Sequence, residues 1–464
     1  MPRSGTLPTV LAGVFITVLD FFIVNVAIPS TQRDLHAGPT AIEWVVAGYA
    51  LAYGSGLILG GRLGDVHGRR RMFSLGTALF TLASVACGLA PNATALIVAR
   101  VAQGAAAALL SPQVLAIIRT AYSGPARSRA VNAYALTMGL AAVFGQLIGG
   151  VLIHADLFGL GWRACFLLNV PIGITVLAVA RRMVPESRAA DAARLDLPGA
   201  ALITSALAAT LLPLIEGREQ GWPAWTWVSF AASAALFTAF GRRRLPHSPL
   251  IDPALFRQRA FVAGLFTYLA FTMGMAAYFL IFALYVQQGR GLDALEAGFA
   301  FVPIGAGYLA ASLLAPRLAA RLGRQVIAIG GLTRAVGLAA LLVMAGQGAA
   351  VAWLVPALIV DGIGMGLALG PIMTTVLAGV AQKHAGSAAS ALTTVQQVGG
   401  ALGVGAVGIV YYGSVGDGVP LAFRHGLIHL IVVALVLTAL VQLLPRGAGK
   451  PSALEPSARE GAPA

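Results

Sequence analysis

The sequence predicts an all-α polytopic membrane protein, and three observations lead to this fold class. Of the 464 residues, 58% are hydrophobic and only 10% are charged, whereas ordinary soluble proteins carry about 25% charged residues. The mean hydropathy of +0.83 leaves too little polar surface to coat the roughly three soluble domains that length alone would suggest. Apolar runs of about 20 residues recur along the whole chain, and each can cross ~30 Å of hydrocarbon.

Fourteen apolar segments are expected to span the membrane, and the loops between them are too short to hold a soluble domain. The first run is too long for a signal-peptide core and should remain as a helix. The tail from Pro445 is rich in glycine, proline, alanine and serine and is predicted to be disordered. The expected segments are residues 8–31, 43–62, 72–91, 93–117, 131–155, 162–181, 196–216, 224–241, 260–287, 296–316, 325–346, 350–374, 386–412 and 422–444.

The distribution of lysine and arginine predicts the orientation of the chain. Alternate loops form two sets; the set that includes both termini holds 24 basic residues, the other holds 5, and Arg100 and Arg334 inside segments complete the 31. Because cytoplasmic loops carry the excess of basic residues, both termini are expected in the cytoplasm. That topology requires an even number of crossings, which fourteen satisfies.

Several functional classes are excluded by composition and spacing. The net charge of +14 comes from short clusters between apolar runs, without the basic face and interleaved aromatic residues of a nucleic-acid binder. Two cysteines, Cys87 and Cys165, are too few for a disulfide scaffold or a cysteine-ligated metal. The histidines lack metal-ligand spacing, and no phosphate-binding G-x-x-x-x-G-K-[ST] loop is present. We therefore expect no enzyme, no cofactor and no metal site.

A weak internal repeat relates the two ends of the chain. Residues 62–69, Arg-Leu-Gly-Asp-Val-His-Gly-Arg, are echoed by residues 317–324, Arg-Leu-Ala-Ala-Arg-Leu-Gly-Arg, at an offset of 317 − 62 = 255 residues. This offset maps the first six segments onto the last six and leaves the seventh and eighth as an insertion. Two related halves imply a site at their interface that opens alternately to each side. The expected organisation is a six-helix half at 1–190, an inserted pair at 191–245, a second half at 246–445 and a cytoplasmic tail at 446–464.

The loop after the second segment reads Gly-Arg-Leu-Gly-Asp-Val-His-Gly-Arg-Arg-Arg at residues 61–71. A loop that only fixes the membrane topology would need the arginines, but it would need neither the glycines nor Asp65. The stretch resembles the signature loop of the major facilitator superfamily, G-x-L-a-D-r-x-G-r-k, although Val66 stands where a basic residue is usual. The resemblance implies a cytoplasmic latch in which Asp65 meets a helix N-terminus of the other half, a contact worth roughly 0.3–1 kcal/mol. The matching residues are Gly61, Leu63, Asp65, Gly68, Arg69 and Arg70.

Asp20 lies within the first segment, about 12 residues or ~18 Å from its cytoplasmic end. A carboxyl group at that depth by default marks function, the alternative being a structural hydrogen bond from a protonated aspartate. Residues 19–29 resemble the first-helix motif of drug/proton antiporters, l-D-x-T-v-v-N-v-A-l-P. Asp20, Asn25, Ala27 and Pro29 match, and Phe22 replaces the usual threonine.

Arg100 lies in the fourth segment at a comparable depth, ~10 Å from the outer end. Gln103 and Gly104 follow at i+3 and i+4 and share its helix face, while snorkelling of the arginine to the surface is the alternative. The run resembles the superfamily motif R-x-x-q-G, whose arginine faces the cavity and takes part in proton coupling. We expect Asp20 and Arg100 to be partners, so that a proton on Asp20 frees Arg100.

Three further segments resemble the fourteen-helix drug/proton antiporters of the EmrB/QacA type. Residues 139–150 are glycine-rich like the antiporter motif G-P-x-x-G-G, with Gln146 in place of proline, although close helix packing alone also explains the glycines. Residues 162–173 and 393–403 match later segments of that family. Gln396 and Gln397 are candidate donors in the cavity, with a helix–helix hydrogen bond equally compatible for one of them.

Arg334 and Asp361 lie inside the eleventh and twelfth segments, at ~14 and ~20 Å from the cytoplasmic face. They are within reach of each other, either as a buried pair that fixes helix packing or with Asp361 as a second proton-carrying acid. His429 is expected to be a satisfied interior histidine.

The resemblance implies a major facilitator fold and proton-coupled export of small amphipathic compounds, such as drugs, antibiotics and lipophilic cations. Asp20, Arg100 and Asp361 are expected to couple protons to transport. A proton symporter, a narrow exporter of a metabolite and a transport-dead sensor remain alternatives. We expect a monomer in the bacterial cytoplasmic membrane, with substrate, protons and lipid as its only partners. An inward-open cavity should be lined from segments 1, 4, 5, 9, 12 and 13, with polar contacts from Asn25, Gln103, Gln146, Arg334, Gln396 and Gln397.

Overall fold

The computed structural model describes residues 4–188, 196–242, 253–346, 350–378, 380 and 385–444, and every regular element in these ranges is helical. The predicted tail at 446–464 lies outside the described residues. The first group of helices is α1 (Thr6–Leu35), α2 (Pro39–His67), α3 (Arg69–Gly88), α4 (Ala93–Ala121), α5 (Gly124–Ala155), η1 (Leu157–Gly159), α6 (Arg163–Leu167) and α7 (Asn169–Met183). The remaining elements are α8 (Leu197–Glu216), α9 (Ala224–Arg242), α10 (Pro253–Phe256), α11 (Arg259–Leu284), η2 (Tyr285–Gly289), α12 (Ala294–Leu322), α13 (Gln325–Gly346), α14 (Val351–Ala378), α15 (Ala385–Ser414), η4 (Val415–Asp417) and α16 (Val419–Val441).

The helices confirm the all-α polytopic class. In the part of the chain that the structure describes, twelve helices are long and apolar enough to cross a membrane, and α2 and α5, bent by 47° and 41°, bring the number to fourteen when each bent helix counts as one span. The sixth expected segment is broken at Leu168 into α6 and α7. Pro171 accounts for this break, because its ring clashes with the carbonyl of Leu167 four residues earlier and it lacks an N–H.

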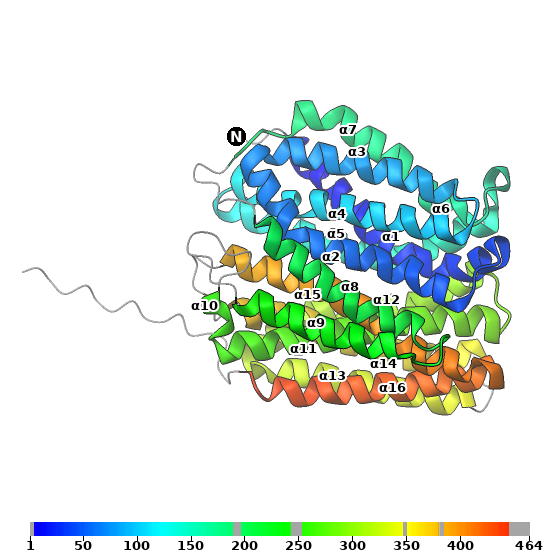
Figure 1. The fold of residues 1–464 in the computed structure, drawn as a ribbon. Coiled ribbons are helices and arrows are strands. Elements are labelled where there is room, and N and C mark those ends of the chain that lie inside the picture. Colours follow the sequence, from blue (N-terminus) through cyan, green and yellow to red (C-terminus); the bar gives the residue numbers. More distant parts are fainter. Residues whose placement is uncertain are drawn as a thin grey trace, which may run out of the picture.

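Equivalent pairs of helices pack together within residues 6–183 and within residues 259–441. α1 packs on α5, α2 and α3 pack on α4, and α3 packs on α7; correspondingly, α11 packs on α15, α12 and α13 pack on α14, and α13 packs on α16. The two groups lie side by side (Figure 1) and meet through α2 against α15 and α5 against α12. This repeated packing supports the proposed division into two related halves, called here the N-half (α1–α7) and the C-half (α11–α16).

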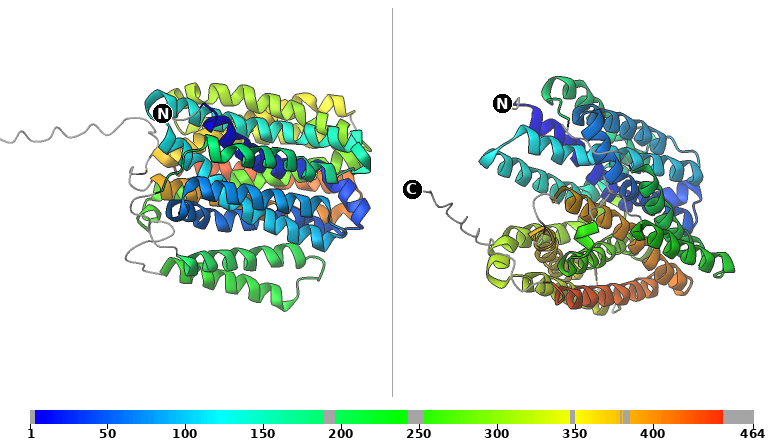
Figure 2. Two further views of the ribbon diagram at one scale, coloured as in Figure 1. Left: turned by 90° about the horizontal axis from the view of Figure 1, so that it is seen from above. Right: turned by 60° about the vertical axis from the view of Figure 1, so that its left-hand side comes forward.

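The pair α8–α9 forms a hairpin on the outside of the bundle, as the left view of Figure 2 shows. α8 packs against α9, α2 and α15, so it contacts both halves. α9 buries only Thr226 and Ser233, and Trp227 and Val228 on it are more than 60% exposed. An apolar helix that exposes its large side chains fits contact with lipid, so the hairpin is a peripheral addition rather than part of the core.

The two ends of the bundle differ in charge. The end that carries Arg69, Arg119 and Arg181 is called the inner end, because the lysine and arginine distribution predicts that it faces the cytoplasm. The N-terminal end of α1 lies at this same end (Figure 1). The opposite end, where α1 meets α2, is called the outer end.

Candidate functional site

A cavity of about 500 Å³ lies between the two halves. The described residues that line it come from α1, α2, α4, α5, α11 and α15, with Arg69 at the start of α3. Arg62, Asp65 and Arg119 line its inner-end side, so it opens toward that end. Expected segments 1, 4, 5, 9 and 13 thus contribute, whereas α14, the twelfth, gives no described lining residue. α14 instead packs between α12 and α13, and α2 takes part in the wall.

Aromatic and polar contacts between the halves close the outer end. Phe22 of α1 packs edge-on against Phe279 of α11 with ring centroids 5.1 Å apart. Gln287 Nε2 donates to the Val26 carbonyl at 3.1 Å. The conformation is therefore closed at the outer end and open at the inner end, the state that the sequence predicts.

A further outer contact joins α5 to the start of α12. His154 Nδ1 lies 3.1 Å from Asp293 Oδ2, and both side chains are about half exposed. Asp293 also caps α12 by accepting from the Glu296 backbone N–H at 2.8 Å. That hydrogen bond, with the one from His154, lowers the pKa of the Asp293 carboxyl, so Asp293 remains an acceptor at the outer surface.

The cavity wall combines aromatic, hydroxyl and amide groups. Gln396 and Gln397 of α15 both line it, as the sequence predicts, opposite Phe21 and Tyr53 of the N-half. Pockets of 300–1,000 Å³ with few polar groups among apolar side chains are typical small-molecule sites. The volume and lining therefore suit one amphipathic compound of drug size.

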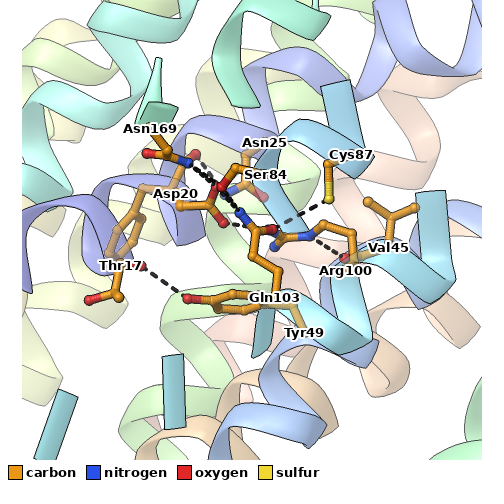
Figure 3. Close-up of polar contacts among 11 residues, drawn as sticks. Thr17, Asp20, Asn25, Val45, Tyr49, Ser84, Cys87, Arg100, Gln103 and Asn169 are labelled. Atoms are coloured by element: carbon orange, nitrogen blue, oxygen red, sulfur yellow. Dashed lines mark hydrogen bonds and ion pairs between the residues drawn. The ribbon is translucent and has the colours of Figure 1, made fainter. Parts of the chain in front are cut away.

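Behind the N-half wall lies a sealed polar cluster, shown in Figure 3. Arg100 of α4 forms an ion pair and hydrogen bond with Asp20 of α1, and neither side chain has any exposed surface. The contact between these two residues is the one that the sequence predicts. Buried charges of this kind are paired because an isolated ion in an apolar interior is very costly.

Two amides complete the coordination of Asp20. Gln103 Nε2 and Asn169 Nδ2 each donate to Asp20 Oδ1 at 2.8 Å. The same two amides donate to Ser84 Oγ of α3, at 2.8 and 3.2 Å. Asp20 therefore holds α1 to α4 and α7, with α3 joined through Ser84, and a change in its charge would act on four helices at once.

Arg100 has partners besides Asp20. Its Nε donates to the Val45 carbonyl at 3.0 Å and its Nη1 to Gln103 Oε1 at 2.7 Å. The guanidinium carbon lies 4.2 Å from the centre of the Tyr49 ring, a cation–π contact. Tyr49 in turn donates to the Thr17 carbonyl at 3.2 Å, and Thr17 lines the cavity. One aromatic side chain thus separates the arginine from the cavity wall.

A second buried ion pair lies in the C-half. Arg334 Nε of α13 is 3.2 Å from Asp361 Oδ1 of α14, with side chains 4% and 0% exposed. Arg334 Nη2 also donates to the Gly274 carbonyl of α11 at 3.0 Å. Neither Asp361 oxygen receives a well-aligned hydrogen bond from the described residues. Asp361 is therefore held less firmly than Asp20, which accepts from Arg100 and two amides.

Four of the expected cavity residues lie elsewhere in this conformation. Gln103 belongs to the sealed cluster, where it donates to Asp20. Asn25 donates to the Phe22 carbonyl of its own helix at 3.1 Å. Arg334 forms its ion pair with Asp361. Gln146 is fully buried beside α12, and its amide atoms have no partner among the described residues. These four placements correct the prediction, because depth along a helix does not fix which face points to the cavity.

The sequence profile of the Major Facilitator Superfamily matches residues 10–404. The chain belongs to this superfamily. A probable actinorhodin transporter of Streptomyces coelicolor is 36% identical over 424 residues, which cover 89% of this chain and 73% of that protein. Puromycin resistance protein pur8 of Streptomyces alboniger is 35% identical, covering 95% and 90%. The cephamycin export protein CmcT of Amycolatopsis lactamdurans is also 35% identical, covering 93% and 90%.

Solved structures of other transporters share the fold. A peptide transporter POT in complex with sulfate superposes with a TM-score of 0.69 at 18% identity, covering 96% of this chain and 98% of that one. A D-xylose-proton symporter gives 0.68 at 16% identity, covering 95% and 97%. At these identities the likeness concerns the fold alone, and the major facilitator fold expected from the sequence is confirmed.

The superfamily's signature loop is folded against its own half. Asp65 pairs with Arg69 at 2.7 Å, one helical turn away. Arg70 N donates to Glu186 Oε1 at 3.0 Å, and Gly68 has a φ of +108°, where a Cβ would lie 2.7 Å from Glu186. The contact expected between Asp65 and the other half is not made by the described residues, because the cavity is open at this end. Gly61 lines the cavity mouth.

Sequence reasoning missed several members of the sealed cluster. Ser84 and Tyr49 are ordinary residues for membrane helices and carry no motif of their own. Asn169 stands out in the sequence only as part of the superfamily match around residues 162–173. Its position two residues before Pro171, where α7 begins, is the available signal, because such breaks place polar groups at the membrane midplane.

Proposed function

We propose that this superfamily member is a proton-coupled antiporter that exports amphipathic small molecules from the cytoplasm. The actinorhodin, puromycin and cephamycin proteins to which it is similar are named for transport, resistance or export of antibiotics. We place the chain among the fourteen-helix drug/proton antiporters, in the bacterial cytoplasmic membrane with both termini inside. The lysine and arginine distribution supports this orientation.

The Asp20–Arg100 pair carries this proposal. It is fully buried, it lies behind the cavity wall, and it includes a group that can take up a proton. Thr17 and Phe21, one turn before and one residue after Asp20, line the cavity, so a shift of α1 changes the carboxyl environment and the substrate site together. A structural pair alone would not need to lie beside the transport pathway.

A proton on Asp20 would cancel its charge and leave Arg100 held by the Val45 carbonyl, Gln103 and the Tyr49 ring. The attraction between α1 and α4 would then weaken. Phe21 connects this change to the other half, because a Cβ on Gly400 of α15 would lie 3.6 Å from its ring. The protonation state of Asp20 thereby favours one of two packings of the halves, which is what alternating access requires.

In this cycle Asp20 takes a proton while the cavity faces outward and releases it when the cavity faces the cytoplasm. Substrate enters from the cytoplasm as the proton leaves. Asp361 is assigned as a second proton-linked acid, because its carboxylate has weaker hydrogen bonding than that of Asp20. Asp65 would leave Arg69 and engage the C-half when the inner end closes, which latches the outward-facing state.

The test is transport by the full chain in liposomes under an imposed pH gradient. Antiport predicts that an inward proton gradient drives lipophilic cations, neutral antibiotics or acidic antibiotics out of the proton-receiving compartment. Accumulation of the compound on the same side as the protons would instead establish symport. Transport that ignores the gradient would overturn proton coupling while leaving the fold and export intact.

A further inference from the structure

Glu43 is a buried acid at the outer end that the proposed cycle does not use. It lies in the second turn of α2, and its side chain is 1% exposed. Arg218, in the loop between α8 and α9, lies 3.5 Å from Glu43 Oε1 through its Nη2. The other oxygen, Oε2, has no hydrogen-bond partner among the described residues. A carboxylate with one long contact and one unpaired oxygen is an expensive group to bury ionised.

Glu43 lies where three parts of the molecule meet. A Cβ on Gly408 of α15 would come within 2.4 Å of Glu43 Oε1, so the carboxyl group rests against the backbone of the C-half. Arg218 comes from the inserted pair, and its guanidinium lies 5.0 Å from the Tyr412 ring of α15. We call the contact between α2 and α15 around Glu43 and Gly408 the outer seam. Because α2 and α15 belong to different halves, the seam must part when the cavity opens outward.

The charges at the seam do not balance. Arg218 is shared with Glu219 at 3.7 Å, and Glu216 accepts from Trp44 Nε1 at 2.8 Å. Three acids therefore face one arginine, and Glu219 is 45% exposed whereas Glu43 is sealed. The charged groups that act on Glu43 are Arg218, Glu219 and Glu216, and the phenol of Tyr412 faces it from α15.

We propose that Glu43 is a further proton-binding site, distinct from Asp20 and Asp361, and that it is filled from the outer medium when the outer seam closes. The proton binds at the unpaired Oε2, removes the excess negative charge and leaves the carboxyl group neutral against Gly408. When the seam parts, Glu43 and Arg218 meet water and the proton returns to the same side. Binding and closure are linked reciprocally: closure favours the proton, and the proton favours closure.

This site differs in purpose from Asp20. A proton that enters and leaves on the outer side adds nothing to the transported charge, so Glu43 changes the balance between the two conformations rather than the stoichiometry. Acid outside then favours the inward-facing state that accepts cytoplasmic substrate. The inserted pair supplies Arg218, which competes with the proton for Glu43 and so sets the pH at which the seam closes.

The inference rests on alternating access, which is part of the proposed function. Its test measures the distance between two labels across the seam and does not depend on transport. Gly38 and Gly413 flank the seam at the ends of α2 and α15, and a Cβ at either meets nothing within 4 Å. Spin labels on Gly38→Cys and Gly413→Cys would report seam opening in lipid nanodiscs across a pH series. Cys87 and Cys165 are buried, and the chain without added cysteines measures their background labelling.

The wild-type closed fraction should rise as pH falls, with a closed-to-open ratio that changes by at most about tenfold per pH unit for one linked proton. Glu43→Gln should stay closed and lose this dependence. Arg218→Gln should close at higher pH than wild type, because the competing cation is gone, and Arg218→Lys should restore the wild-type range. Gly408→Ala, which places a methyl group against the carboxyl, should open the seam at every pH.

Three results would overturn the proposal, two from the variants at the seam and one from Asp20→Asn. The first is a Glu43→Gln chain that keeps the wild-type pH dependence. The second is an Arg218→Gln chain whose seam opens, because this would show that the ionised Glu43–Arg218 pair, and not the proton, holds the seam closed. The same pH series is measured with Asp20→Asn. If seam closure still depends on pH in this variant, the effect of Glu43 is separate from the coupling site. If the pH dependence disappears, it belongs to Asp20 and the inference is refuted.

Discussion

A double-mutant cycle on Asp20 and Arg100 measures whether the two side chains are energetically coupled as the contacts indicate. Arg100→Gln removes the only cation that contacts Asp20 among the described residues and leaves the carboxylate with two amide donors. Asp20→Asn leaves the guanidinium with Gln103 and the Val45 carbonyl. Each single change strands a charge in the core, whereas the double variant strands none.

The expected magnitude follows from complete burial. Removing one partner of a buried ion pair costs about 3–5 kcal/mol, while replacing both costs far less. An unfolding entropy of about 2.1 cal/mol/K per residue gives roughly 1 kcal/mol/K for 464 residues. Each single variant should therefore lower Tm by about 3–5 °C or more. The shift can be larger because helices that persist in the unfolded state reduce the unfolding entropy. The double variant should recover most of the lost Tm.

The assay is thermal unfolding of the purified wild-type and variant chains in one detergent and one buffer. Asp34 and Arg163 provide the matched control, since they also join an aspartate of α1 to an arginine, at 2.6 Å, but with side chains 45% and 28% exposed. Exposed pairs are worth about 0–1 kcal/mol, so their cycle should show little coupling. A double variant of Asp20 and Arg100 no more stable than its worse single parent would refute the reasoning.

Three further outcomes are expected. Gln396→Ala should weaken substrate binding about two- to tenfold, because one hydrogen bond is lost. The concentration for half-maximal transport measures this change, and an unchanged value would place Gln396 outside the substrate site. Gly104→Val should prevent a stable fold, because a Cβ there would lie 2.3 Å from the Tyr49 carbonyl; a normal melting curve would show that α2 and α4 can separate. Arg62 and Arg119 line the cavity mouth, so compounds with an acidic group should be exported in preference to matched cations, and Arg119→Gln should reduce that preference; a preference for cations in a competition assay would contradict this.

The sequence is most informative where chemistry leaves few choices. A carboxyl group and a guanidinium within apolar segments must find partners, and the helical rise places Asp20 and Arg100 at comparable depth. Their contact is therefore predictable from the sequence alone. The repeated loop and the count of apolar segments similarly lead to the fold, because a membrane permits few alternatives to a helix bundle.

Rotation of each helix about its own axis is beyond the sequence. Gln103 shares a face with Arg100 at i+3, and that face turns toward Asp20 rather than the cavity. Gln146 lies against α12 for the same reason. Contacts between residues far apart in the chain also cannot be predicted from the sequence. Arg218 contacts Glu43 from 175 residues away, and it belongs to the inserted pair, which has no counterpart in the repeat.

The pairing of Asp65 with Arg69 depends on the conformation as well as on the sequence. The loop motif predicts a latch between halves, but an open inner end leaves the acid to its own helical neighbour. A motif identifies the residues that change partners, whereas only the packing of the halves decides which partner is present. The partner that Asp65 has in a given conformation is therefore not encoded in the loop sequence.

Proton movement triggered by substrate is the most direct test of coupling through Asp20. The chain is reconstituted into liposomes that hold a pH-sensitive dye, a proton gradient is imposed, and lipophilic cations, neutral antibiotics and acidic antibiotics are added in turn. We predict that at least one class moves protons through the wild-type chain and that Asp20→Asn abolishes this movement while Asp34→Asn retains it. Equal proton movement in wild type and Asp20→Asn would contradict the assignment of Asp20 as the coupling acid.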